Sequence, residues 1–114
     1  MRILLDECVD RRLGRELAGH DVSTVPQMGW AARRNGERLA ASQNSFDAFV
    51  TVDRNLSIQQ DLTAYAIAVI VLRATSNRLR DLRPLVPALL AVLGTAPKGQ
   101  ATVVGLVPPH TSAR

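Results

Sequence analysis

The residues best placed for chemistry are two acidic side chains that each follow a short apolar segment. Asp6 comes directly after Ile3-Leu4-Leu5, and Asp53 comes directly after residues 48–52. In open α/β sheets, ligands bind beyond the carboxyl ends of the strands, where the strand order reverses. If the strands lie in the order 2-1-3-4-5, the two carboxylates face each other at that point. Crowded carboxylates repel each other unless a hard cation neutralises them, which predicts Mg²⁺ or Mn²⁺.

Further acids could complete this metal site. Glu37 falls in the first turn of a predicted helix, and Glu7 and Asp10 are candidates for its outer members. We therefore assign Asp6, Glu37 and Asp53 as catalytic and metal-binding residues. The alternative is purely structural, because acids at strand ends commonly cap helices or hold turns in α/β loops. In that case Asp6 and Asp10 cap the first helix, Asp53 holds a turn and Glu37 is an exposed helix residue.

Basic residues flank the predicted acidic site. The chain carries 14 Lys and Arg against 10 Asp and Glu, a net charge of +4, and only one of the 14 is Lys. Arginine binds phosphate oxygens with two donors at once, so the balance allows an RNA partner without requiring one. The candidate RNA-binding residues are Asn55, Arg54, Arg33, Arg34 and Arg38. A second group could extend them, namely Arg11, Arg12 and Arg15. Either group could also be an ordinary solvated surface.

Apolar segments alternate with helix-period segments along the chain, which is typical of an α/β fold with parallel strands. The predicted strands cover residues 3–5, 22–25, 48–52, 66–72 and 102–107. The predicted helical segments begin at Asp10, Glu37, Ser57 and Ser76, and the last bends or restarts at Pro84 and Pro87. An apolar loop that carries Met28 and Trp30 spans residues 26–36. We expect one domain over residues 1–107 and a flexible tail over residues 108–114.

Several classes of protein are excluded by composition. The single Cys8 cannot form an intramolecular disulfide or a Cys-based zinc finger, and His20 and His110 have no metal-ligand spacing. No apolar segment reaches the roughly 18 residues of a membrane-spanning helix, and too few residues precede Asp6 for a signal peptide. We expect a cytoplasmic protein without a membrane partner. Cys8 lacks a nearby His or Lys, so it is expected to be a small buried side chain rather than a nucleophile.

Three segments together resemble a known family. They are Met-Arg-Ile-Leu-Leu-Asp-Glu at residues 1–7, Asn-Gly-Glu-Arg-Leu-Ala at residues 35–40, and Phe-Val-Thr-Val-Asp-Arg-Asn-Leu at residues 49–56. In this order and spacing they resemble the short, single-domain bacterial group of PIN-like (PilT N-terminus) domains, over residues 1–93. The resemblance implies a three-layer α/β sandwich around a mostly parallel five-stranded sheet. It also implies a metal-dependent ribonuclease, in many cases the toxin of a toxin-antitoxin pair.

The resemblance also assigns residues, with departures. Asp6 and Asp53 match metal carboxylates of the family. The family's helix Asp is Asn35 here, with Glu37 two residues later as its substitute, and a second acid of the late motif is Asn55. An amide in place of a carboxylate removes one charge from the metal site, so the affinity for Mg²⁺ should fall.

Three functions follow as alternatives. The first is a ribonuclease that uses Mg²⁺ or Mn²⁺ and has RNA and an antitoxin as partners. The second is a catalytically impaired PIN-like module that binds RNA or a protein, with the apolar loop around Met28 and Trp30 as a partner surface or a homodimer contact. The third is a receiver-like phosphoacceptor domain with Asp53 as the acceptor. A receiver needs a lysine after the fifth strand, whereas Lys98 precedes it.

Overall fold

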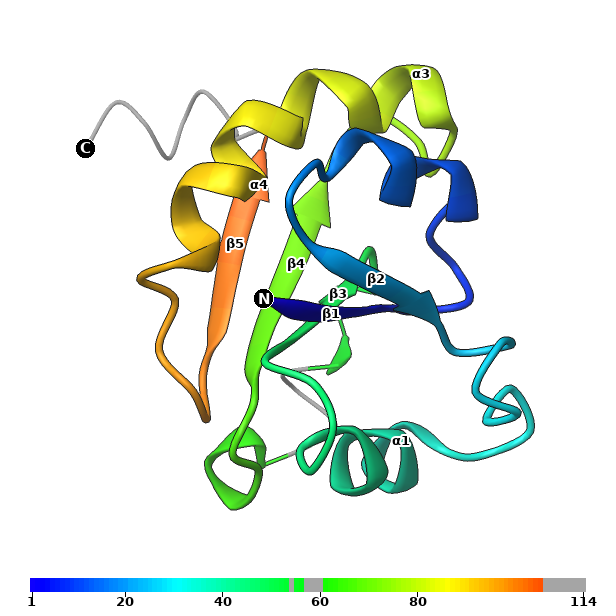
Figure 1. Cartoon of the computed structure of the whole chain (residues 1–114), viewed down its shortest axis with the longest axis vertical. Helices are drawn as coiled ribbons and strands as arrows, with labels where there is room; N and C mark the ends of the chain where they lie inside the picture. The colour runs from blue at the N-terminus through cyan, green and yellow to red at the C-terminus, as the bar shows by residue number, and fades with distance from the viewer. Residues whose placement is uncertain (54, 57–60, 106–114) are drawn as a thin grey trace.

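A five-stranded, all-parallel sheet forms the centre of the computed structural model, which describes residues 1–53, 55–56 and 61–105 (Figure 1). Its strands are β1 (Arg2–Leu5), β2 (Asp21–Thr24), β3 (Ala48–Thr51), β4 (Ala68–Arg73) and β5 (Ala101–Gly105). Their order is β2-β1-β3-β4-β5, and every neighbouring pair is parallel. This confirms the parallel α/β fold, and the order is the one that brings Asp6 and Asp53 to the same edge.

The inner strands β1, β3 and β4 are mostly apolar and buried because both faces of the sheet are covered, whereas the edge strands β2 and β5 are largely exposed or half-buried. Ile3, Leu4 and Leu5 are all fully buried, and successive residues point to opposite faces. Leu4 packs in one hydrophobic cluster with Phe49, whereas Ile3 and Leu5 pack in another with Val50. The register pairs Leu4 with Phe49 across β1 and β3, so the two strands end side by side.

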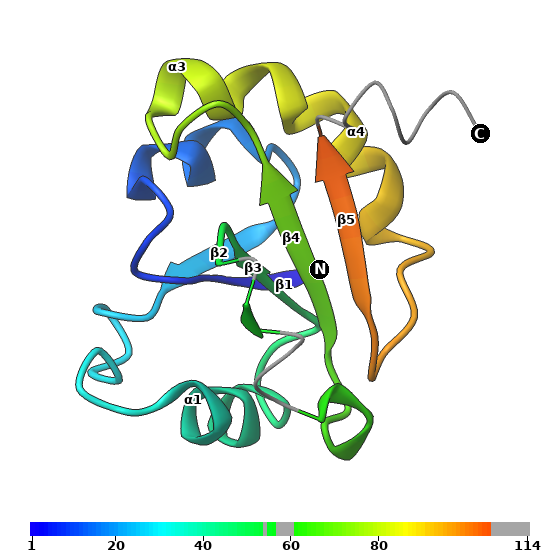
Figure 2. The same cartoon turned by 180° about the vertical axis from the view of Figure 1, so that it is seen from behind.

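The C-terminal helices and a short N-terminal helix cover one face of the sheet. They are the 3-10 helices η1 (Arg11–Glu16) and η3 (Arg83–Leu85) and the α-helices α3 (Leu79–Leu82) and α4 (Val86–Leu93). Leu13 of η1, Leu82 of α3 and Leu89 of α4 are fully buried in the same cluster as Ile3. Figure 2 shows α3 and α4 on the far side of the sheet from α1.

The other face is covered by α1 (Asn35–Ser42), by the 3-10 helix η2 (Leu62–Ala64) and by the loop that precedes α1. Leu39 of α1 is fully buried there, and Phe46 meets Trp30 edge to face with ring centroids 6.4 Å apart. Trp30 and Met28 pack against this cluster as well. The apolar character of the loop is therefore explained by its cover of the sheet.

Two helical segments differ from the sequence prediction. The segment after Asp10 is a 3-10 helix of six residues rather than an α-helix, although Asp10 caps it by accepting from Arg12 N. Gly14 lets it lie against β2, because an added Cβ would come 3.1 Å from Val22 Cγ1. The segment after Ser76 divides into α3, η3 and α4, and the interruptions coincide with Pro84 and Pro87, which lack a backbone donor.

Some predicted segments lie wholly or partly outside the described residues. Residues 57–60 of the predicted helical turn, residues 106–107 of the last strand and the predicted tail 108–114 belong to this group. Among the helices that the structure describes, none is long and apolar enough to cross a membrane.

Candidate functional site

The candidate site lies at the carboxyl ends of β1 and β3, where the strand order reverses. Asp6 follows β1, Thr51 ends β3 and Asp53 comes two residues later. The Thr51 hydroxyl donates to Asp6 Oδ2 at 2.8 Å and accepts from the Asp53 backbone N–H at 3.0 Å. One hydroxyl therefore joins the two predicted acidic positions, which are 47 residues apart in the chain. Sequence reasoning missed Thr51, although it is the polar last residue of an otherwise apolar strand.

The Asp6 carboxylate is buried, and both of its oxygens accept hydrogen bonds. Only 4% of the surface of Asp6 is exposed to solvent. Oδ1 accepts from Glu7 N at 2.8 Å and from the Arg38 guanidinium at 3.2 Å, while Oδ2 accepts from Thr51 and from the Cys8 thiol at 3.4 Å. A buried carboxylate is tolerated when it is paired and hydrogen-bonded in this way.

Arg38 provides the positive charge that balances this carboxylate. It is 7% exposed and reaches across from α1. Besides Asp6, its guanidinium donates to Glu7 Oε1 at 2.5 Å and to the backbone carbonyls of Ala31 at 2.6 Å and Trp30 at 3.3 Å. Arg38 was predicted to bind RNA, but its guanidinium is bound to the protein's own acids and carbonyls. Its donors would have to be released before they could bind a phosphate.

Glu37 is placed differently from the other two predicted acids. It is exposed on α1, one residue before the buried Arg38. In the part of the chain that the structure describes, no three His, Cys, Asp or Glu side chains come close enough to share a metal ion. Asp53 Oδ1 accepts from Asn55 N at 2.9 Å, so Asp53 also holds the turn that the structural alternative assigned to it.

These observations test how well the site suits a divalent cation. Carboxylate oxygens are ligands that Mg²⁺ and Mn²⁺ accept, so Asp6 and Asp53 are suitable in kind. Asp6, however, is already paired with the Arg38 guanidinium, which is shared with Glu7. A cation would therefore have to displace the guanidinium from Asp6, and Glu37 would have to turn towards the site to join it.

Three of the remaining predicted RNA-binding residues, Arg33, Arg34 and Asn55, come from the two segments that carry Arg38 and Asp53. Arg33 and Arg34 are exposed in the loop before α1, and Arg33 Cζ lies 5.6 Å from the centroid of the Trp30 ring. Asn55 is exposed beyond Asp53. The prediction for Arg54 falls outside the described residues. Asn35 begins α1.

Cys8 and Asp10 have shifted acidities. Burial raises the pKa of the Cys8 thiol above its ordinary value of 9.0, and hydrogen bonds from its surroundings only partly oppose this. The thiol is therefore protonated at neutral pH, which agrees with a packing role. Asp10 accepts from the Arg12 backbone and guanidinium, and these bonds lower the pKa of Asp10 to about 2. Asp10 is thus bound to Arg12 as the cap of η1.

A depression of about 360 Å³ opens beside Asp6, between the ends of β1 and β2. Glu7, Thr24 and Gln27 contribute to its lining. It lies beyond the carboxyl ends of β1 and β2, next to the point between β1 and β3 where the strand order reverses and where α/β sheets usually bind ligands. We call it the acidic crevice.

No model of a protein family, no curated protein and no solved structure matches this chain. The chemistry of the site is therefore inferred from its own residues.

Proposed function

We propose that this protein is a PIN-like ribonuclease that depends on Mg²⁺ or Mn²⁺ and hydrolyses RNA phosphodiesters at the carboxyl ends of β1 and β3, beside the acidic crevice. The observation that carries the proposal is the link from Asp6 through the Thr51 hydroxyl to Asp53, at the point where the strand order reverses. The proposal includes the three-layer PIN-like arrangement of the fold. An antitoxin is the proposed protein partner.

In this proposal Asp6 and Asp53 hold the cation, and Glu37 joins them from α1. The bound ion would supply a Lewis acid and an activated water. Thr51 fixes the Asp6 carboxylate and the Asp53 backbone in one arrangement, which is the kind of support that neighbouring groups give to metal ligands. Arg38 balances the charge of Asp6 when no cation is bound, and Arg33, Arg34 and Asn55 contact the RNA.

A second candidate function is an RNA- or protein-binding module that has lost catalysis. The buried ion pair between Arg38 and Asp6 favours it, because an internal guanidinium, shared with Glu7, already occupies the carboxylate that a metal would need. Asn55 in place of an acid points in the same direction. A receiver-like function gains less support, since Lys98 precedes β5 and so belongs to the opposite end of that strand from the acids.

The test is cleavage of a mixed set of labelled single-stranded RNAs with Mn²⁺, Mg²⁺ or EDTA. We expect cleavage with Mn²⁺ that falls by roughly 10²-fold or more in Asp6→Asn and in Asp53→Asn, since even groups that only support a metal ligand often contribute that much. Asp21→Asn is the matched control, because Asp21 is exposed at the amino end of β2. Equal activity of wild type and Asp6→Asn would reject the nuclease and leave the binding module.

A further inference from the structure

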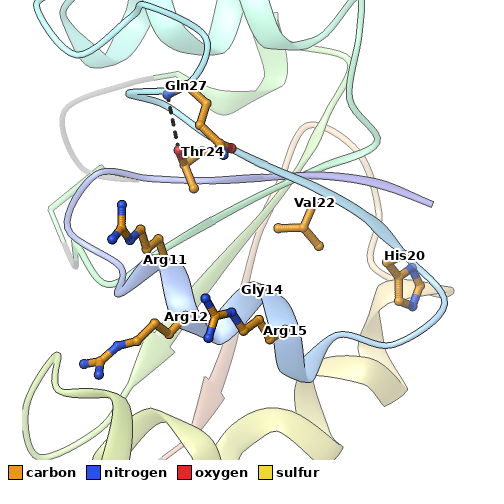
Figure 3. A pocket seen from close by; sticks show the side chains of 8 residues that line it. All are labelled: Arg11, Arg12, Gly14, Arg15, His20, Val22, Thr24 and Gln27. Atoms are coloured by element: carbon orange, nitrogen blue, oxygen red, sulfur yellow. Dashed lines mark hydrogen bonds between the residues drawn. The ribbon is translucent and has the colours of Figure 1, made fainter.

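A second depression, more basic than the first, lies between η1 and β2. It measures about 460 Å³. Its lining includes Arg11, Arg12, Arg15, His20, Thr24 and Gln27 (Figure 3). The sequence analysis considered its three arginines only as an extension of the Arg33 group. We call this the arginine depression.

The three arginines come from one short helix, and they do not have equal freedom. Arg12 is bound to Asp10 through Nε at 3.1 Å and Nη2 at 2.7 Å. Arg11 and Arg15 are exposed, and neither forms an ion pair with an acid of the described residues. Figure 3 shows Arg11 extending towards the turn of Thr24 and Gln27, whereas Arg12 points away from β2. Arg11 and Arg15 are therefore the charges available to an anion.

His20 also lines the arginine depression, and Figure 3 draws it at the end of the loop between η1 and β2. Its Nδ1 forms no hydrogen bond within the described part of the protein, but this atom is closed to solvent and so cannot reach an anion in the depression. The charges that an anion can meet there are therefore those of Arg11 and Arg15.

The arginine depression adjoins the acidic crevice. Both are lined by Arg11, Thr24 and Gln27, so the two hollows share a wall. Beyond that wall lie Asp6 and Glu7. An extended anion that rests on Arg11 and Arg15 would therefore be directed towards Asp6 without crossing another element of the fold.

We propose that the arginine depression binds a phosphate of an RNA backbone, with Arg11 and Arg15 as its anchors. The proposal rests on the proposed function for the identity of the anion as RNA. No Phe, Tyr or Trp is among the described residues that line the depression, and arginine side chains suit the phosphate backbone, so we expect it to bind the backbone without reading the base sequence. The main RNA contact would then lie on η1 rather than on the loop that carries Arg33.

The test is RNA binding in EDTA, which prevents metal-dependent cleavage. The affinity of a labelled single-stranded RNA is measured by fluorescence anisotropy over a series of NaCl concentrations for wild type and for Arg11→Gln/Arg15→Gln. The matched control is Arg2→Gln/Lys98→Gln, which removes the same charge from exposed residues elsewhere on the molecule. Thermal unfolding of each variant verifies that it is folded.

We expect the Arg11/Arg15 variant to bind RNA about tenfold more weakly than wild type. The slope of log affinity against log salt concentration should become shallower by about 1.4, since each phosphate contact to a single strand contributes about 0.7 to it. The Arg2/Lys98 variant should keep the wild-type slope. Equal losses in both double variants, no loss in either, or no RNA binding by the wild type would each overturn the proposal. Cleavage by a wild type whose Arg11/Arg15 variant binds normally would reject this site and leave the nuclease intact. Binding that depends on Arg11 and Arg15 without any cleavage would do the reverse.

Discussion

At the scale of single residues, Arg38 controls whether the Asp6 carboxylate is available to a cation. Its guanidinium balances Asp6 within a region that is almost closed to water, where an unpaired charge is costly. The same contact holds α1 and the preceding loop to the end of β1. Arg38 therefore stabilises the packing of α1 against β1. Any cation that binds Asp6 also has to displace the Arg38 guanidinium from it.

Replacement of Arg38 should destabilise the protein strongly. Arg38→Met leaves the buried Asp6 without its counter-charge, and breaking a buried ion pair from one side typically costs about 3 kcal/mol or more. Urea unfolding measures the loss. Arg38→Met/Asp6→Asn should recover part of it, because the stranded charge is gone. Arg34→Met, an exposed neighbour on the same segment, serves as the control and should change little. An Arg38→Met protein as stable as wild type would contradict the assigned role.

Asp10 should make stability depend on acid pH. Its bonds to Arg12 lower the pKa of Asp10 from 3.8 to about 2 in the folded state. A lowered pKa means that the stabilisation is fully present above the unfolded value near 3.8 and is lost as the pH falls through about 2. The effect is small because the pair is exposed to solvent. Unfolding of wild type and Asp10→Asn between pH 2 and 6 should show curves that converge at the acid end. A constant gap over this range would contradict the shift.

The Cys8 thiol should be a poor nucleophile. Burial raises the pKa of Cys8 above 9.0, so little thiolate exists at pH 7 to 8. Alkylation by iodoacetamide should be slower in the folded protein than in urea at the same pH. Thiolate absorbance at 240 nm during a pH titration measures the pKa directly. A midpoint below 9.0 would contradict the prediction.

At the scale of elements, the strands were more predictable than the helices. The three inner strands β1, β3 and β4 are mostly apolar and almost wholly buried, so composition locates them, whereas the edge strands β2 and β5 are more exposed and carry a weaker apolar signal. Whether a segment forms an α-helix or a 3-10 helix depends instead on the elements that pack against it. The segment after Asp10 has the spacing of an α-helix, yet its close approach to β2 at Gly14 accompanies six residues of 3-10 helix. That approach is a tertiary contact, which the local spacing of apolar residues cannot predict.

Gly105 at the end of β5 should not tolerate a side chain. Its φ is +126°, and an added Cβ would lie 2.1 Å from the Arg73 carbonyl oxygen of the neighbouring strand. Gly105→Ala should therefore lower the free energy of unfolding by about 2 kcal/mol or more, from backbone strain together with the displaced contact. Gly94→Ala is the matched control, because nothing lies within 4 Å of its added Cβ. Equal stability of the two variants in urea would contradict this prediction.

At the scale of the whole molecule, topology explains how much of the site could be predicted. The placement of Asp6 and Asp53 at neighbouring strand ends could be predicted because parallel strands end at one edge and the order places β1 beside β3. The partners of Asp6 could not be found in the same way. Thr51 and Arg38 reach it from different elements, and their contacts depend on side-chain packing across the fold. Periodicity carries no information about such contacts.

The net charge of +4 also takes its meaning from the whole molecule. Arg38 is buried and balanced, and Arg12 is bound to Asp10. Arg11 and Arg15 remain exposed beside the acidic crevice, so the position of the charge matters more than its sum.

The most direct test of the central claim is a crystal structure of the protein grown with Mn²⁺, with anomalous scattering recorded to locate the ion. The nuclease proposal predicts an anomalous peak bonded to the carboxylates of Asp6 and Asp53, with the Arg38 guanidinium withdrawn from Asp6. A map without a peak at these carboxylates, and with Arg38 still bound to Asp6, would contradict it.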